Sequence, residues 1–510
     1  MLAKVTSGAT VGLESIPVTV EVDIAEKGLP SFTIVGLPDK AVEESRERVR
    51  AAIKNSGADF PARRITVNLA PADLPKEGPA YDLPIAVGIL IASRQLNDIF
   101  NESLLFGELS LDGSLRHTNG ILSISMLAKE KSIKQVFLPA IDVREAAVIK
   151  GIKIYGVGNL LSLFLHASGK ELISETKHIP FSKLSEEGIY EFDFADIKGQ
   201  EHAKRALEIV ASGGHNIHLK GVPGAGKTML SRAVPGILPS LSEEEALEVT
   251  KLYSITGNIP AGESIIKHRP FRSPHHTTSR IGLIGGGTRP MPGEISLAHR
   301  GVLFLDEFPE FPRHVLEALR QPMEDGIITV SRAAGTIAFP AKFILIAASN
   351  PCPCGYFGDP TNRCKCLPGQ IARYQKRISG PLSDRIDLHI EVPAVKVDEL
   401  TIELKERVEK SSIIQKRVEK ARAIQRKKFK GEKIFSNGEM NVKQIKKFCS
   451  LSEDAKRLLR QAVQTLHLSA RTYFRMIKVG QTIADLDGVS QISQYHIAEA
   501  LQYRPAESIL

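Results

Sequence analysis

The segment Gly221-Val-Pro-Gly-Ala-Gly-Lys227-Thr228 constrains this chain more than any other, because it is a complete G-x-x-x-x-G-K-T phosphate loop. It follows the apolar run at residues 217–219 and precedes a helix-like stretch, which is the strand–loop–helix context that the motif requires. Backbone N–H groups of such a loop, at a helix N-terminus, point at a phosphate. The segment therefore predicts an α/β domain of the P-loop type that binds a nucleotide.

A second motif, Val302-Leu-Phe-Leu-Asp306-Glu307, reads as a buried strand that ends in two acids. Lys227 would lie against the β- and γ-phosphates, and Thr228 and Asp306 would hold Mg²⁺. Glu307 would polarise water for attack on the γ-phosphate. The two motifs together predict an ATPase with ATP and Mg²⁺ as cofactors. The predicted nucleotide-binding residues are Gly221, Val222, Pro223, Gly224, Ala225, Gly226, Lys227, Thr228 and Met229.

Further polar residues fall where a ring-shaped ATPase needs them. Asn350 ends the apolar run Phe343-Ile-Leu-Ile-Ala-Ala-Ser-Asn and would orient the attacking water. Arg385 follows a helix-like stretch, from which it would reach the nucleotide of a neighbouring subunit. A positive charge supplied in trans is worth about 10³–10⁵ in rate in well-studied cases. Arg471 begins a helix and would contact the nucleotide of its own chain. Any one of these residues alone is a weak signal, and their order after the phosphate loop makes the set informative.

Composition places the chain among globular proteins of two to four domains, with 510 residues, 42% apolar and 25% charged. No apolar run approaches the roughly 20 residues that span a bilayer, and the first residues lack the pattern of a signal peptide. We therefore expect a cytoplasmic protein. Residues 1–190 hold 21 Lys and Arg against 23 Asp and Glu, whereas residues 191–510 hold 46 against 35. This basic excess favours a polyanionic partner for the second half.

Four segments are predicted along the chain. Residues 1–165 alternate strands, as at 18–24 and 65–69, with helices, as at 41–56. Residues 166–191 are polar, lack a clear period and are interpreted as a linker. Residues 192–394 alternate strands and helices as in a parallel sheet covered by helices. Residues 395–510 are helical. Within them, residues 416–433 hold nine basic and two acidic side chains, which is consistent with either a solvated helix face or a DNA contact.

Four cysteines crowd into the insertion at 352–366, as Cys352-x-Cys354 and Cys364-x-Cys366. Four thiolates favour tetrahedral Zn²⁺, and four protein ligands leave no open position, so the metal would be structural. The C-x-C spacing is tighter than the usual C-x₂-C. A loop of reduced free thiols is the alternative interpretation.

The long motifs Phe271-Arg-Ser-Pro-His-His-Thr-Thr and Pro292-Gly-Glu-Ile-Ser-Leu-Ala-His-Arg-Gly resemble those of magnesium-chelatase-like AAA+ ATPases. Asn350-Pro-Cys-Pro-Cys-Gly and Arg475-Met-Ile-Lys-Val-Gly-Gln resemble the ComM/YifB family more closely, and the resemblance covers essentially the whole chain. It implies that Asn350 is the sensor-1 residue, Arg385 the arginine finger and Arg471 the sensor-2 arginine of a C-terminal helical lid. It also implies a homohexameric ring that acts as a DNA helicase on single-stranded and branched DNA, promoting branch migration in homologous recombination and natural transformation.

The first segment resembles the α+β domain of Lon-type proteases, whose Ser–Lys pair cleaves peptides. Pro79-Ala80-Tyr resembles the nucleophile segment, and Asn119-Gly-Ile-Leu122 resembles the lysine segment. Ala80 and Leu122 occupy the two catalytic positions, so the resemblance keeps the fold and removes the peptidase activity. The domain would then be a scaffold or a collar that contacts DNA.

Two basic elements are candidate DNA contacts. Residues 326–339 predict a strand–turn–strand hairpin with Arg332 at the turn, which in this ATPase group projects into the ring pore. The glycine-rich stretch ending at Arg289 is a second basic loop. Either is also consistent with an ordinary turn. A chelatase-type motor subunit that remodels a partner protein is the main alternative function. The basic excess of the second half favours DNA instead.

Overall fold

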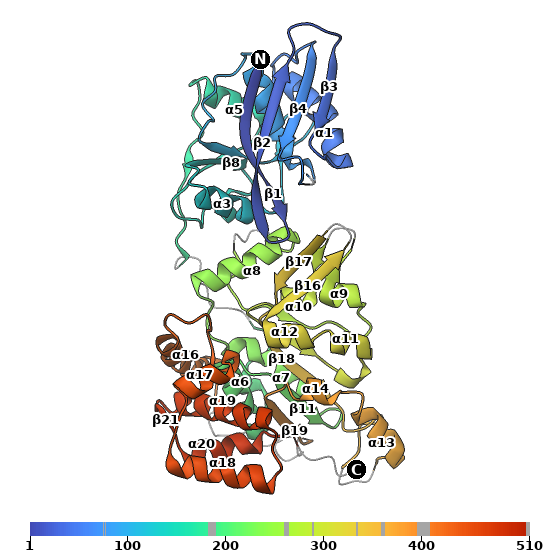
Figure 1. Ribbon diagram of the computed structural model, residues 1–510, viewed down its shortest axis with the longest axis vertical. Coiled ribbons are helices and arrows are strands. Elements are labelled where there is room, and N and C mark those ends of the chain that lie inside the picture. The colour runs from blue at the N-terminus through green and yellow to red at the C-terminus, as the bar shows by residue number, and fades with distance from the viewer. Residues whose placement is uncertain are drawn as a thin grey trace. The chain divides into compact units, whose positions relative to one another are not determined.

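The computed structural model describes residues 1–74, 76, 78–181, 190–259, 265–287, 290–332, 335–358, 363–394 and 409–505 (Figure 1). The chain divides into two compact units. Unit 1 consists of Met1–Glu186 together with Glu243–Lys267, and unit 2 consists of Glu187–Ser242 together with His268–Leu510. Residues 243–267 thus lie inside the sequence of the ATPase core yet pack with the N-terminal residues, which the sequence analysis did not predict.

Unit 1 is built on an eight-stranded mixed sheet with the strand order β10-β9-β8-β5-β1-β2-β4-β3. The antiparallel pairing of β1 with β2 and of β2 with β4 forms one half, and parallel pairing of β5, β8 and β9 forms the other. The strands are β1 (Leu2–Val11), β2 (Glu14–Ile24), β3 (Ser31–Val35), β4 (Arg64–Ala70), β5 (Ser103–Leu105), β8 (Gln135–Pro139), β9 (Lys153–Val157) and β10 (Glu175–Thr176), with a small ribbon of β6 (Glu108–Leu109) and β7 (Leu115–Arg116).

The helices of unit 1 pack against this sheet or, as α8 does against α3, against one another. They are α1 (Lys40–Asn55), η1 (Pro79–Tyr81), α2 (Asp82–Ala92), α3 (Ile121–Glu130), α4 (Val143–Ala146), α5 (Leu160–Ala167) and α8 (Glu243–Ile255). The expected strands at 18–24 and 65–69 and the expected helix at 41–56 are confirmed by β2, β4 and α1. Every residue of α2 is buried, which its nearly continuous apolar sequence explains.

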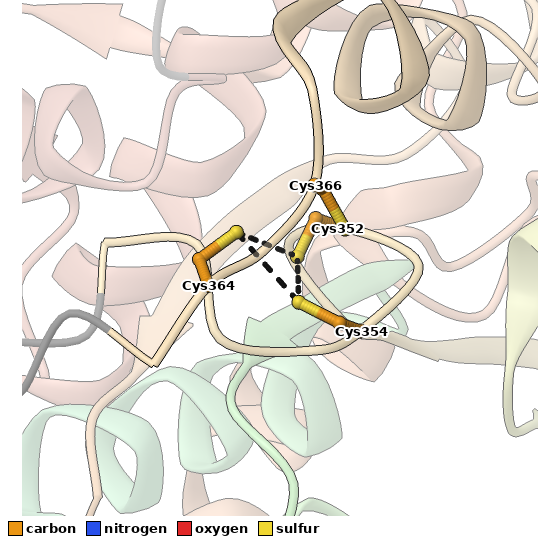
Figure 2. A group of neighbouring side chains, drawn as sticks. All are labelled: Cys352, Cys354, Cys364 and Cys366. Carbon is orange, nitrogen blue, oxygen red and sulfur yellow. Dashed lines mark hydrogen bonds between the residues drawn. The ribbon is translucent and has the colours of Figure 1, made fainter.

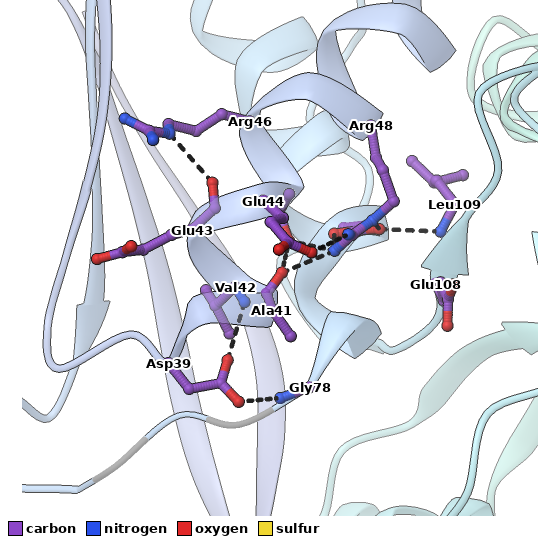
Figure 3. Close-up of polar contacts among 12 residues, drawn as sticks. Asp39, Ala41, Val42, Glu43, Glu44, Arg46, Arg48, Gly78, Glu108 and Leu109 are labelled. Atoms are coloured by element: carbon purple, nitrogen blue, oxygen red, sulfur yellow. Dashed lines mark hydrogen bonds and ion pairs between the residues drawn. The ribbon is translucent and has the colours of Figure 1, made fainter.

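Polar contacts fix the two helices that flank the Ala80 segment (Figure 3). Asp39 caps α1 by accepting the Val42 N–H at 2.9 Å, and its other oxygen accepts the Gly78 N–H at 3.2 Å. Arg48 of α1 donates at 2.7 Å to Asp82, a fully buried carboxylate at the start of α2. A buried acid needs such a partner, so α1 and α2 are held in one arrangement.

Unit 2 contains a five-stranded, fully parallel sheet with the order β12-β15-β18-β11-β19. The strand β11 (Ile217–Gly221) lies between β18 (Ile344–Ser349) and β19 (Leu388–Val392), and β15 (Val302–Leu305) and β12 (Phe271–Arg272) follow outward from β18. Because all five strands are parallel, their carboxyl ends lie at one edge. The expected parallel α/β core is confirmed, and its phosphate loop and acid pair share that edge.

Helices and three small antiparallel or parallel ribbons complete unit 2. The core helices are α6 (Glu201–Gly213), α7 (Lys227–Ala233), α9 (Arg280–Ile284), α10 (Glu294–Leu297), α11 (Arg313–Glu317), α12 (Arg320–Asp325), α13 (Pro368–Gln375) and α14 (Gly380–Ser383). The ribbons pair β13 (Gly285–Gly286) with β14 (Met291–Pro292), β16 (Ile327–Arg332) with β17 (Gly335–Pro340), and β20 (Ser450–Leu451) with β21 (Gln491–Ile492).

The C-terminal part of unit 2 is helical, with α19 packed against α16 and α20 (Figure 1). Its elements are α16 (Ser411–Lys428), α17 (Val442–Phe448), α18 (Glu453–Thr465), α19 (Ala470–Leu486) and α20 (Gln494–Gln502). Its buried residues, among them Leu459, Met476 and Ile497, belong to the same apolar cluster as Leu219 of the central strand. The sheet and these helices therefore share one core.

Candidate nucleotide site and its surroundings

The phosphate loop joins the central strand β11 to α7. Gly224 and Gly226 have φ angles of +78° and +86°, a left-handed conformation that side chains with a Cβ rarely adopt. This explains why the loop needs glycine at these two positions. Met229 lies in the first turn of α7, and Ala225 is buried beneath the loop.

The ammonium group of Lys227 is buried and has three acceptors. Its Nζ donates to the carbonyl oxygens of Gly221 at 2.7 Å and Val222 at 3.0 Å, and to Asn350 Oδ1 at 3.2 Å. Burial lowers the pKa of Lys227, and the charge of Asp306 opposes that shift. The three acceptors match the three donors of an ammonium group, so the lysine is oriented before any phosphate arrives.

The hydroxyl of Thr228 and the carboxylate of Asp306 meet although 78 residues separate them in the chain. Thr228 Oγ1 donates to Asp306 Oδ2 at 2.9 Å, and Asp306 Oδ1 accepts the N–H of Glu307 at 2.9 Å. Hard oxygen ligands of this kind suit Mg²⁺, which is commonly bound by one or two protein groups together with substrate phosphates. The structure therefore brings together four predicted residues, Lys227, Thr228, Asp306 and Asn350, at one edge of the sheet.

The remaining acid, Glu307, is paired with a histidine that the sequence analysis did not assign to this site. His276 Nδ1 lies 3.0 Å from Glu307 Oε2. His276 stands in the loop after β12, and its ring packs edge-on against Phe311. Glu307 has a φ of +49°, which turns the chain sharply directly after β15. The adjacent histidines His275 and His276 were visible in the sequence, but no local pattern links them to Glu307, which follows the later strand β15.

Two of the long sequence motifs are joined by a two-pronged ion pair. Arg272 Nε and Nη2 donate to the two oxygens of Glu294 at 2.6 Å and 2.7 Å. His299, in the same motif as Glu294, is buried and accepts the N–H of Lys342 at 3.0 Å. The ion pair fixes the end of β12, from which the His276 loop begins, to α10. The His299 contact fixes the segment before β15 to the segment before β18.

The two predicted arginines, Arg385 and Arg471, form a second cluster around Glu324. Arg385 pairs with Glu324 at the end of α12, and its side chain is only 14% exposed. Arg471, in the first turn of α19, lies 3.6 Å from the same carboxylate and 4.0 Å from Asp384. Ser469 caps α19 by accepting the N–H of Thr472, which confirms the predicted start of this helix. Glu324 thus lies within ion-pair distance of both arginines of its own chain.

The four clustered cysteines converge directly after the Asn350 strand (Figure 2). Their sulfur atoms all lie within 4.8 Å of one another, and Cys352 is buried. The Sγ atoms of Cys352 and Cys354 are 3.4 Å apart, and Cys364 lies 3.8 Å and 3.6 Å from these two. Zn–S bonds of about 2.3 Å in a tetrahedron place sulfurs about 3.8 Å apart. The arrangement, completed by Cys366, therefore fits one tetrahedral ion, whereas Cys449 lies apart in the helical region.

Comparisons with known proteins agree along the chain. Family models match for magnesium chelatase, subunit ChlI, at residues 193–400; for subunit ChlI of Mg-chelatase at residues 20–142; and for the ChlI C-terminal region at residues 408–504. The chain is 45% identical to competence protein ComM of Haemophilus influenzae and 43% identical to YifB of Salmonella typhimurium, covering 100% of this chain and 98% of each relative. It is 23% identical to magnesium-chelatase subunit ChlI of Porphyra purpurea over 42% of this chain and 61% of that protein.

The chain belongs to the ComM/YifB family of magnesium-chelatase-like proteins. Membership implies an AAA+ ATPase, in agreement with the phosphate loop and the acid pair. Among the described residues of this ComM/YifB-family protein, no helix combines the length and the apolar content needed to cross a bilayer.

The predicted hairpin of this ComM/YifB-family protein is present as β16 and β17. The two strands pair in register from Ile327 opposite Pro340 to Arg332 opposite Gly335. Arg332 therefore stands at the last pair before the turn. The other predicted DNA contact, Arg289, lies outside the described residues.

The basic stretch of the ComM/YifB-family protein, residues 416–433, contains both ion-paired and exposed cations. Arg417 bonds Glu208 and Glu409, and Lys428 bonds Asp485 at 2.9 Å, so these cations stabilise the fold. Other cations of the same stretch are exposed, namely Lys416, Lys420, Arg426, Lys427, Lys430 and Lys433. The paired cations stabilise the fold, whereas the exposed ones remain consistent with either a solvated helix face or a DNA contact.

The positions that correspond to a protease dyad are buried in unit 1 of the ComM/YifB-family protein. Ala80 is 6% exposed and Leu122 is fully buried. The Leu122 N–H donates to Glu145 Oε1 at 2.9 Å, and the same oxygen accepts the hydroxyl of Ser254 at 2.5 Å. Glu145 thus binds the start of α3 to the end of α8, the helix contributed from within the ATPase sequence.

Proposed function

We propose that this protein is an ATP-driven DNA motor that moves branched or recombining strands. The observation that carries the proposal is the assembled ATP site: Lys227, Thr228, Asp306 and Asn350 converge on one sheet edge. The relative that is 45% identical over the full length is named a competence protein, which supports a role in natural transformation and homologous recombination.

Within this proposal each residue has a defined task. Lys227 and the loop N–H groups bind the phosphates, Thr228 and Asp306 hold Mg²⁺, and Glu307 polarises the attacking water, with Asn350 orienting it. Arg385 acts on the nucleotide of a neighbouring subunit and Arg471 on that of its own chain, so hydrolysis requires a ring, which we propose to be a homohexamer. Both arginines must leave Glu324 to do so, because Glu324 pairs with them in the single chain.

DNA is the proposed partner because the basic excess of residues 191–510 and the β16–β17 hairpin suit binding that does not depend on base sequence. Residues 191–510 hold 46 basic and 35 acidic residues, which supplies the phosphate attraction that a motor needs. The β16–β17 hairpin carries Arg332 at its tip, on an element that a hydrolysis cycle can displace. We propose that Arg332 and Arg289 contact phosphates in the ring pore.

We further propose that the N-terminal unit is a Lon-like domain without peptidase activity, and that α16 to α20 form the lid over the nucleotide. The four cysteines are proposed to hold a structural Zn²⁺, for which the sulfur spacing is the support. Reduced thiolates of this kind are typical of the cytoplasm, where we place the protein.

The proposal is tested by measuring ATP hydrolysis with single-stranded, duplex and branched DNA, together with movement of a synthetic three- or four-strand junction. We expect stimulation by DNA and binding that weakens steeply with salt. Arg332→Ala should reduce DNA-stimulated hydrolysis more than basal hydrolysis. Arg457→Ala, on an exposed helix position where Arg457 pairs with Asp454 of the same helix, serves as the matched control.

A chelatase-type motor that remodels a partner protein is the second candidate, favoured by the match to the magnesium chelatase family models. It replaces the DNA motor if assembled protein with ATP and Mg²⁺ hydrolyses ATP yet neither binds DNA at low salt nor moves a junction.

A further inference from the structure

The cysteine loop, which we define as residues 352–358 and 363–366, packs directly on the phosphate loop. Gly355 has a φ of +88°, and a Cβ placed there would lie 2.5 Å from Pro223 Cγ and 2.7 Å from Pro223 Cδ. Real Cβ atoms do not approach other atoms this closely. The backbone at Gly355 therefore lies in contact with the proline at the centre of the phosphate loop.

The same loop is anchored to the other side of the nucleotide site. It begins two residues after Asn350, whose Oδ1 accepts the Lys227 ammonium. Pro351 O accepts Gln375 Nε2 at 3.2 Å, which ties the start of the loop to α13. The cysteine loop therefore contacts Pro223 and follows closely on Asn350 in the chain.

Short-range contacts hold the loop's fold, and the sulfur cluster closes it. The Gly355 N–H donates to Cys352 O at 3.0 Å, and the Phe357 N–H donates to Cys352 Sγ at 3.3 Å. A backbone donor to a sulfur is the kind of outer contact that steadies a thiolate ligand. One ion bound by four thiolates would join Cys352 and Cys354 to Cys364 and Cys366. When the ion is lost, the four thiols are free to move apart.

We propose that the ion at Cys352, Cys354, Cys364 and Cys366 acts as a clamp on the phosphate loop, so that nucleotide affinity depends on Zn²⁺ that never touches the nucleotide. This inference rests on the proposed nucleotide and zinc sites, and it adds that zinc binding raises the affinity for the nucleotide. With Zn²⁺ bound, Gly355 supports Pro223 and the loop N–H groups stay oriented toward phosphate. Without Zn²⁺, the phosphate loop has to be ordered when the nucleotide binds. The conformational entropy lost in that ordering reduces the affinity for the nucleotide.

The first experiment uses two glycine substitutions in the full-length protein. Gly355→Ala drives a methyl group into Pro223, whereas Gly358→Ala, at a φ of +83°, meets no atom of the described residues within 4 Å. Both therefore impose similar backbone strain in the same loop, and only one affects the phosphate loop. Zinc content is measured by mass spectrometry and affinity with a fluorescent ATP analogue and Mg²⁺. We expect zinc in both variants, and affinity weakened about tenfold or more only in Gly355→Ala, since overpacking is costly.

The second experiment removes the metal from the wild-type protein with a zinc-selective chelator and restores it. We expect nucleotide affinity to fall about tenfold or more as zinc leaves and to return with added Zn²⁺ but not with added Mg²⁺. Reversal by Zn²⁺ separates this effect from unfolding. Equal affinity of zinc-free and zinc-loaded protein, equal affinity of the two glycine variants, or zinc-free folded protein that binds nucleotide as isolated would each overturn the clamp. Failure of zinc-loaded wild-type protein to bind nucleotide would overturn the proposed ATP site instead.

Discussion

His276 Nδ1 lies 3.0 Å from Glu307 Oε2, so the carboxylate proposed to polarise water is paired with a side chain from the loop after β12. A carboxylate oxygen that is occupied by an imidazole is less available to a water molecule. Arg272, at the end of β12 where this loop begins, is itself paired with Glu294 of α10. If Glu307 polarises the attacking water as proposed, the His276–Glu307 pair would restrain hydrolysis, and the sequence motifs do not reveal it.

We expect His276→Ala to raise hydrolysis in the absence of DNA. Because both side chains are partly exposed, the pair is worth at most about 1 kcal/mol, which corresponds to a rise of up to about fivefold. Steady-state phosphate release measures the effect. His275→Ala is the matched control, since His275 bonds Thr277 at 2.9 Å instead of Glu307. A loss of basal hydrolysis in His276→Ala would mean that the histidine positions Glu307 for catalysis.

If Arg385 acts on the nucleotide of a neighbouring subunit, rings that mix two inactive variants should regain some ATP hydrolysis. Arg385→Ala subunits keep their own site but supply no arginine, whereas Glu307→Gln subunits supply the arginine but cannot hydrolyse. Each variant alone should be inactive, and a one-to-one mixture should recover up to about a quarter of the wild-type rate, the share of interfaces that combine both functions.

Mixing Arg385→Ala with the double variant Arg385→Ala, Glu307→Gln is the negative control, because no subunit then supplies an arginine. Normal hydrolysis by Arg385→Ala alone would show that Glu324 is the structural partner of this arginine and nothing more.

Glu145 predicts a pH-dependent stability of unit 1. Burial raises the pKa of its carboxyl group, with hydrogen bonds from Ser254 and Leu122 acting in the opposite direction. A raised folded-state pKa means that this group favours folding below its unfolded pKa, and that the contribution is lost as pH rises through the folded value. Glu145→Gln keeps an oxygen that accepts both donors, so it should stabilise the fold at pH 8, with the gain shrinking as the pH falls toward 5.

Thermal unfolding followed by circular dichroism at both pH values measures this difference. Glu130→Gln, an exposed position of α3, is the matched control and should leave stability nearly unchanged at either pH. Destabilisation by Glu145→Gln of equal size at pH 8 and pH 5 would contradict the argument.

We predict that the protein has no peptidase activity. Ala80 lacks a nucleophile, and the fully buried Leu122 has no amine that could act as a base. Casein should remain intact with ATP and Mg²⁺. Cleavage that is lost in Lys227→Ala protein purified in parallel would refute the prediction, because it could not come from a contaminating protease.

The sequence was sufficient to predict that Lys227, Thr228, Asp306 and Asn350 lie together, because its motifs are local or end at neighbouring strands. The phosphate loop is a motif of eight consecutive residues, and the structure explains two of its glycines, Gly224 and Gly226, by their positive φ angles. Parallel strands bring their carboxyl ends to one edge, so Asp306 and Asn350 were expected near Lys227. The cysteine spacing likewise indicated a cluster, since four thiols within fifteen residues have few ways to avoid one another.

The sequence by itself determined the phosphate loop, the acid pair and the alternating elements of both halves, because these depend on short-range geometry and on the period of apolar residues. Only the tertiary structure decided that His276 pairs with Glu307, that Gly355 touches Pro223, that Glu324 gathers Arg385 and Arg471, and that α8 packs with unit 1. Each of these joins residues that no short motif relates. Their contacts follow from the strand order and from how loops pack, which are set by the summed burial of the whole core.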